Sequence, residues 1–237
     1  MPDLPRHFWY TISSFGGASV TLPLTLAIAL WLAVGYSSRI AGGWLLLIAC
    51  AASIVTATKL AFLGWGIGVR EWDFTGLSGH AMMSTAVYPA VFFVALLPAR
   101  PAVRLAGIAA GFGVGVAISF SRVVVEAHSP SEAIAGCLMG ALNALIFIRL
   151  AWHATPRRSP LSTVPVIVSL LVLMAALHNV HVPTHRWVEH IALKVSGHTR
   201  PFVRARWKAA HDDSSQTLYA PLSHTHHALA PLQPRIV

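Results

Sequence analysis

A series of long apolar runs limits what this chain can fold into. About 18 consecutive apolar residues cross a bilayer as a helix, because lipid offers no partners to backbone N–H and C=O groups. Six runs approach or exceed this length: Ser19–Tyr36, Trp44–Leu63, Ala81–Leu97, Leu105–Phe120, Ala133–Trp152 and Thr163–Leu177. The expected fold is therefore all-α, a polytopic membrane helical bundle with about six transmembrane helices.

Composition supports a membrane protein over a soluble domain. Hydrophobic residues make up 55% of the 237 residues and charged residues only 11%, and the mean hydropathy is +0.64. The start, MPDLPRHFWY, carries only Arg6 before the first run, and no clear cleavage site follows. We therefore interpret the first run as a retained helix and not as a signal peptide.

The net charge of +9 is best explained by membrane orientation. Six arginines lie at or after the ends of runs one, three and five: Arg39, Arg100, Arg104, Arg149, Arg157 and Arg158. Loops rich in arginine stay in the cytoplasm, so the loops after runs two and four should face outward. The basic C-terminal part would also lie outside if run six spans the membrane, and this position conflicts with the same rule.

No basic motif interleaved with aromatic residues is present, so nucleic acid is not an expected partner.

Three regions are expected along the chain. Residues 1–17 form a short amphipathic lead, residues 18–178 a transmembrane domain, and residues 179–237 a basic tail rich in His and Pro that is expected to be largely disordered. Cys50 and Cys137 lie inside apolar runs without metal-binding spacing, so they are interpreted as packing residues. The tail cluster His224 to His227 is interpreted as solvated and not as a metal site.

The acidic residues are distributed unevenly. Of the eight Asp and Glu residues, four lie near the chain ends. The other four lie in the two loops expected on the outer face: Glu71, Asp73, Glu126 and Glu132. Five basic side chains can converge at the same membrane surface: Lys59, Arg70, His80, Arg122 and His128. Charged groups are costly in a membrane protein and often mark a functional site.

The first outer loop ends in a possible anion site. Ser78 is a favourable N-cap for the following helix, Gly79 allows close approach to the backbone, and His80 falls in the first turn. N–H groups at a helix start bind anions. A plain helix cap with an interfacial histidine explains the same residues.

The second outer loop reads SRVVVEAHSPSE, from Ser121 to Glu132. Ser129 and Glu132 have the spacing of a capping box, so Glu132 has a structural explanation. Glu132 could also reach the His128 ring, select its tautomer and leave the other nitrogen as a nucleophile. Arg122 could grip phosphate oxygens through its guanidinium group. An interfacial patch of salt bridges is the alternative.

Together the two loops resemble the type 2 phosphatidic acid phosphatase superfamily, over about residues 44–152. The family's third motif is Ser-Arg, five residues, His, three residues, Asp. Here it reads Ser121-Arg122, VVVEA, His128, SPS, Glu132, with Glu in place of Asp. The second motif survives as Ser78-Gly79-His80, preceded by Leu instead of Pro. The first departs most, because Arg70 follows Lys59 at wider spacing and precedes Glu71 instead of Pro.

The resemblance implies a metal-independent phosphoric monoester or diphosphate hydrolase without a cofactor. His128 would attack phosphorus to form a phosphohistidine, Glu132 would orient its ring, and His80 would act as the general acid. The residues implied in phosphate binding are Lys59, Ser78, Gly79, Arg122 and Arg70. The implied substrate is a lipid phosphate or diphosphate such as undecaprenyl diphosphate, phosphatidic acid or phosphatidylglycerol phosphate. The expected location is the bacterial inner membrane, with the site on the periplasmic face.

Two alternatives use the same residues differently. A lipid phosphotransferase would pass the phosphate to another acceptor, and the sequence does not separate it from a hydrolase. A non-catalytic, transporter-like membrane protein would keep only an anion site. Transporters place polar groups near the bilayer midplane, whereas here they cluster at helix ends. The sequence predicts no oligomeric state.

Overall fold

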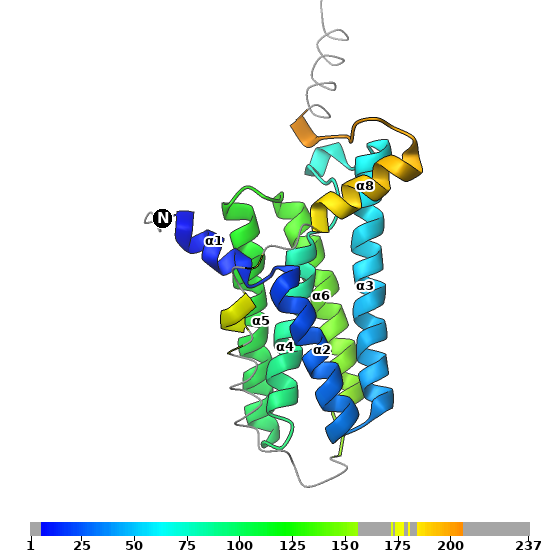
Figure 1. Ribbon diagram of the computed structural model, residues 1–237. Helices are drawn as coiled ribbons and strands as arrows, with labels where there is room; N and C mark the ends of the chain where they lie inside the picture. Colours follow the sequence, from blue (N-terminus) through cyan, green and yellow to red (C-terminus); the bar gives the residue numbers. More distant parts are fainter. Residues whose placement is uncertain (1–5, 156–171, 173, 178–179, 181–183, 206–237) are drawn as a thin grey trace, which may run out of the picture. The chain divides into compact units, whose positions relative to one another are not determined.

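The computed structural model describes residues 6–155, 172, 174–177, 180 and 184–205. The chain divides into a compact unit, Met1–Phe202, and a second unit, Val203–Val237, of which only residues 203–205 are described. The described elements are the helices α1 (Arg6–Ser14), α2 (Ala18–Gly35), α3 (Ser38–Trp65), α4 (Gly79–Ala95), α5 (Pro101–Val124), α6 (Pro130–Ala151) and α8 (Thr184–Ser196), with the 3-10 helix η1 (Arg70–Trp72). Within the described residues the fold is all-α (Figure 1).

The prediction of a helical membrane bundle is confirmed. Helices α2 to α6 correspond to the first five predicted runs, and four helical segments among the described residues are long and apolar enough to cross a membrane. The apolar helix α4 has 17 residues, which is the lower limit of about 17 for a spanning helix. The sixth predicted run, Thr163–Leu177, lies largely outside the described residues.

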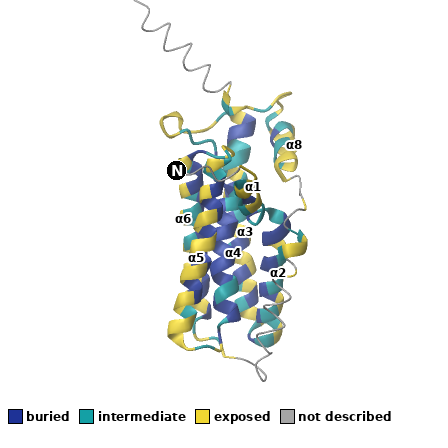
Figure 2. Ribbon diagram, turned by 90° about the vertical axis from the view of Figure 1, so that its left-hand side faces the viewer, coloured by how far each residue is buried: buried dark blue, intermediate teal, exposed yellow. Residues whose placement is uncertain are grey.

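Helix α4 forms the centre of the bundle and contacts α2, α3, α5 and α6. It is buried along most of its length, whereas α5 exposes one face (Figure 2). The outer faces are apolar as well. On α2 the exposed residues Leu22, Leu26 and Leu30 recur every four positions, which places them on one side of the helix. Such faces suit lipid and not water.

Glycines at intervals of four let α5 and α6 approach α4 closely. Gly107, Gly111 and Gly115 of α5 face α4, as do Gly136 and Gly140 of α6. A Cβ atom at Gly111 would lie 2.6 Å from Pro89 Cα. This is small-residue packing between membrane helices, in which dispersion contacts between closely spaced backbones stabilise the pair.

The two outer loops meet at one end of the bundle. Helices α3 and α5 end there and α4 and α6 begin there, at the upper end in Figure 1. A backbone hydrogen bond from Ser78 N to Glu132 O, 3.2 Å long, joins the starts of α4 and α6. The prediction that these loops share a face is therefore confirmed. At the opposite end, Arg104 Nη1 donates to Trp152 O at 3.2 Å.

Within the predicted tail, Thr184–Ser196 forms α8, which packs against α3. Ala192 is fully buried, and a Cβ atom on Gly64 of α3 would lie 3.5 Å from Ala192 O. The contact depends on two small residues. The surrounding His and Lys residues lower the local hydropathy, so the hydropathy pattern does not indicate a buried helix face here. The tail from residue 206 onward, including His224 to His227, lies outside the described residues.

The close packing at Gly111 predicts a position-specific loss of stability. In Gly111→Ala the added methyl group meets the backbone of α4, and overpacking of this kind costs about 1–3 kcal/mol. Gly113→Ala is the matched control, because a Cβ atom there meets nothing within 4 Å. Thermal unfolding in detergent should show a lower melting temperature for Gly111→Ala alone. Equal melting temperatures would contradict the packing described.

Candidate active site

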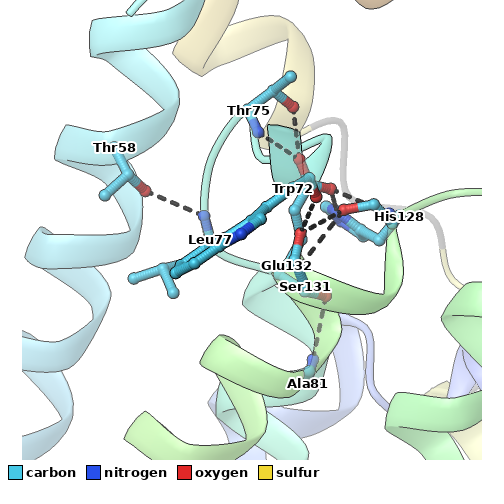
Figure 3. Close-up of polar contacts among 10 residues, drawn as sticks. Thr58, Trp72, Thr75, Leu77, Ala81, His128, Ser131 and Glu132 are labelled. Atoms are coloured by element: carbon cyan, nitrogen blue, oxygen red, sulfur yellow. Dashed lines mark hydrogen bonds and ion pairs between the residues drawn. The ribbon is translucent and has the colours of Figure 1, made fainter. Parts of the chain in front are cut away.

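The centre of the candidate site is a contact between His128 and Glu132 at the start of α6. His128 Nδ1 lies 2.7 Å from Glu132 Oε2 (Figure 3). The Glu132 carboxylate is an acceptor when ionised, so the ring donates its Nδ1 proton to it. The other ring nitrogen, Nε2, then carries the lone pair. This arrangement selects one tautomer of His128, with the proton on Nδ1.

The local sequence explains why Glu132 is in place. Ser129 is the N-cap of α6 and its Oγ accepts from Glu132 N at 3.4 Å, while Ser129 N donates to Glu132 Oε2 at 3.3 Å. The predicted capping box is therefore confirmed. The same carboxylate caps the helix and holds His128, so the two interpretations of Glu132 are compatible.

The second carboxylate oxygen is held by a residue that the sequence analysis missed. Thr75 N and Thr75 Oγ1 both donate to Glu132 Oε1, at 2.7 and 2.5 Å (Figure 3). The Glu132 residue is fully buried, and a buried charge is costly unless hydrogen bonds satisfy it. Thr75 lies 57 residues before Glu132 in an irregular loop, and no motif or spacing signals the pairing.

The surroundings keep the His128 ring neutral near pH 7. Burial lowers the pKa of His128 below its usual 6.5, and the charges of Lys59 and Arg122 lower the pKa further. The hydrogen bond to Glu132 raises the pKa but does not outweigh burial. A neutral ring keeps the lone pair that an attack on phosphorus requires.

His80 lies in the first turn of α4, directly after the first outer loop, whereas His128 lies in the second outer loop. The predicted N-cap is confirmed, because Ser78 Oγ accepts from Ala81 N at 3.4 Å. Ser78 N donates to Glu132 O at 3.2 Å, so the start of α4, which carries His80, lies beside the start of α6. The start of α4 and the start of α6 therefore bring both histidines to one site.

Lys59 and Gly79 are neighbours in the structure. Lys59 lies in the last two turns of α3, and a Cβ atom on Gly79 would lie 3.9 Å from Lys59 Nζ. The absence of a side chain at Gly79 leaves this ammonium group close to the backbone that starts α4. The combination puts a cation beside helix-start N–H groups, which is favourable for an anion.

Arg122 lies in the last turn of α5, and its Nη1 donates to Ser13 Oγ at 2.6 Å. Ser13 is buried at the end of α1, which the sequence analysis treated only as part of the N-terminal lead. The Nε atom of Arg122 is buried and has no hydrogen-bond partner within the part of the chain that the structure describes. A buried donor of this kind can serve an incoming oxygen atom.

Comparison with known proteins gives the family. The PAP2 superfamily, the type 2 phosphatidic acid phosphatase superfamily that the loops resemble, matches residues 69–158. This chain belongs to the PAP2 superfamily. An "Uncharacterized 22.5 kDa protein in cps region" of Klebsiella pneumoniae is 38% identical over 201 residues, which cover 83% of this chain and 95% of that protein. No solved structure matches the chain significantly. PAP2 proteins are generally phosphatases, so family membership supports hydrolysis of a phosphate ester.

One predicted residue of this PAP2 protein is placed differently from the others. Arg70 lies in η1 and is exposed, whereas the other predicted site residues are buried or half-buried. The wider spacing between Lys59 and Arg70 accounts for this, because the intervening residues carry the chain out of α3 and into the loop. A role for Arg70 in phosphate binding stays a prediction.

The contact between Ser13 and Arg122 predicts an effect on anion binding. Ser13→Ala removes the acceptor that orients the guanidinium group, and a hydrogen bond of this kind contributes roughly 1 kcal/mol. The inorganic phosphate concentration that gives half of the maximal thermal stabilisation should then rise about fivefold. Ser14→Ala is the control, because Ser14 Oγ donates only to Thr11 O within α1. Equal shifts in both variants would contradict a role for Ser13 at the site.

Proposed function

We propose that this PAP2 protein is an integral membrane phosphatase that hydrolyses a lipid phosphate or diphosphate through a phosphohistidine, without a metal ion. The observation that carries the proposal is the 2.7 Å contact between His128 Nδ1 and the buried Glu132 carboxylate. It leaves Nε2 as the nucleophilic atom, in a site whose other polar groups are cationic or can donate protons.

In the first step, His128 Nε2 attacks phosphorus and a P–N bond forms. The bond between phosphorus and the leaving oxygen breaks, and His80 gives that oxygen a proton, which it holds only while the bound phosphate anion offsets the charges of Arg122, Lys59 and His128 around it. Glu132 stabilises the positive charge that develops on the His128 ring, because its Oε2 accepts the Nδ1 hydrogen bond. A general acid at the leaving group typically contributes about 10²–10⁴-fold to the rate.

In the second step, water attacks the phosphohistidine. His80, now neutral, takes a proton from that water, the P–N bond breaks and inorganic phosphate leaves. His128 recovers its neutral ring and Nε2 lone pair, and His80 recovers its proton. The protein's atoms and charges return to their starting state, so the net reaction is hydrolysis of one phosphate ester or anhydride bond.

Positive charge and N–H donors stabilise the transferring phosphoryl group. Lys59 and Arg122 supply the charge, and the Nε of Arg122, which has no partner among the described residues, supplies a buried donor. The Ser78 side chain and the Gly79 backbone add groups at the start of α4, and Arg70 can add charge from the loop. Phosphoryl transfer depends mainly on such positioning and electrostatic stabilisation.

The position of the site supports a lipid substrate. The catalytic side chains sit at the ends of apolar helices, so a head group can reach them while its tail stays in the bilayer. Undecaprenyl diphosphate, phosphatidic acid and phosphatidylglycerol phosphate all have this form. The arginines at the opposite end of the bundle favour a cytoplasmic position for that end. We therefore place the site on the periplasmic face of a bacterial inner membrane.

The proposal predicts phosphate release that survives chelation and requires His128. Purified protein in detergent is given the three lipids in turn, with excess EDTA present. His128→Ala should lower the rate at least about a thousandfold, because it removes the nucleophile.

The control for this assay is His153→Ala. His153 follows the C-terminal end of α6, whereas His128 precedes its start. That variant should keep the wild-type rate. A requirement for added divalent metal, or activity that survives His128→Ala, would contradict the proposed mechanism.

A further inference from the structure

Thr75 lies outside the family motifs and contacts the buried Glu132 carboxylate. Its hydroxyl and its backbone N–H both reach Oε1, while Oε2 is bound by His128 and Ser129. The two oxygens thus have separate sets of donors. Thr75 holds one oxygen and so sets which way the other points.

The loop that carries Thr75 is itself attached on two sides. Towards α3, Leu77 N donates to Thr58 Oγ1 at 3.1 Å. Towards α6, Ser131 Oγ donates to Trp72 O at 2.6 Å (Figure 3). The backbone at Thr75 is therefore tied to the helix that carries Lys59 and to the helix that carries Glu132. A residue placed in this way can act as a rigid support for a flexible glutamate arm.

We propose that Thr75 is a positioning residue for the phosphoryl-transfer reaction: its hydroxyl fixes the Glu132 carboxylate so that His128 keeps its Nδ1-protonated tautomer. The expected effect of Thr75 on the reaction rate rests on the proposed function, whereas its expected effect on the His128 tautomer rests on the geometry alone. Glutamate has one more rotatable bond than aspartate, so its carboxylate needs a second point of attachment to stay aligned. The charged groups that act on His128 are Glu132 of α6, Lys59 of α3 and Arg122 of α5.

The test compares Thr75→Val with Thr75→Ser. Valine keeps the branched shape and the backbone N–H but removes the hydroxyl, whereas serine restores the hydroxyl. With the panel lipid that the wild type hydrolyses fastest, Thr75→Val should lower kcat about 10- to 100-fold at unchanged KM. Thr75→Ser should recover most of that loss. Wild-type kcat in Thr75→Val, or a loss that Thr75→Ser shares, would overturn the proposal.

The matched control is Thr58→Val. It removes another threonine hydroxyl that holds the same loop, but this hydroxyl accepts from Leu77 N, whereas the Thr75 hydroxyl donates to Glu132 Oε1. We expect it to lower the melting temperature with little change in kcat. A kcat loss equal to that of Thr75→Val would mean that loop stability alone matters, and would overturn the proposal.

A double-mutant cycle tests whether Thr75 acts through Glu132. If it does, Thr75→Val should add little to the loss in Glu132→Gln, since the orienting carboxylate is already gone. Losses that multiply would show independent roles and overturn the proposal. If Thr75→Val does not fold, Thr75→Ala takes its place in the same comparisons.

A substrate-free measurement separates this inference from the proposed function. Nitrogen NMR of histidine-labelled protein should show the Nδ1-protonated tautomer of His128 in the wild type and a mixed population in Thr75→Val. His128→Ala identifies the resonance. No lipid hydrolysis by the wild type would count against the proposed function only. An unchanged tautomer in Thr75→Val would overturn the role of Thr75 whatever the activity.

Discussion

The structure depends on how one buried carboxylate is satisfied. Glu132 is fully buried near the membrane-spanning part of the bundle, where an unpaired charge would be very costly. Hydrogen bonds from Thr75, His128 and Ser129 to the carboxylate offset the free energy of burying it. These donors come from the loops on both sides of the site, so the same contacts that satisfy the charge also join the loops. Stability and catalytic geometry therefore share their interactions.

Helix packing delivers these loops to one place. Glycines of α5 and α6 allow both helices to lie directly against α4, and a helix pair that packs closely has its ends in register. The ends of α3 and α5 then meet the starts of α4 and α6. Two polar loops separated by about two membrane crossings in sequence become one site, with α1 adding Ser13 to the cluster.

The sequence alone predicted the features that depend on local patterns of residues. Apolar length predicted α2 to α6, and the cap residues predicted the starts of α4 and α6. The contacts of Thr75 and Ser13 were missed because each joins segments far apart in the chain and involves an ordinary hydroxyl. Helix α8 was missed because it packs through Ala192 and Gly64, which carry almost no hydropathy signal. Non-local contacts made by small or hydroxyl-bearing residues are therefore what the sequence did not reveal.

The central claim is that His128 carries the phosphoryl group during turnover. The most direct measurement is mass spectrometry of protein quenched at alkaline pH after brief exposure to a lipid phosphate in the presence of EDTA. The account predicts an acid-labile phosphate on the peptide that contains His128, and more of it in His80→Ala if release is slowed more than formation. Turnover with phosphate on a different residue, or with no phosphorylated protein at any time of quenching, would contradict it.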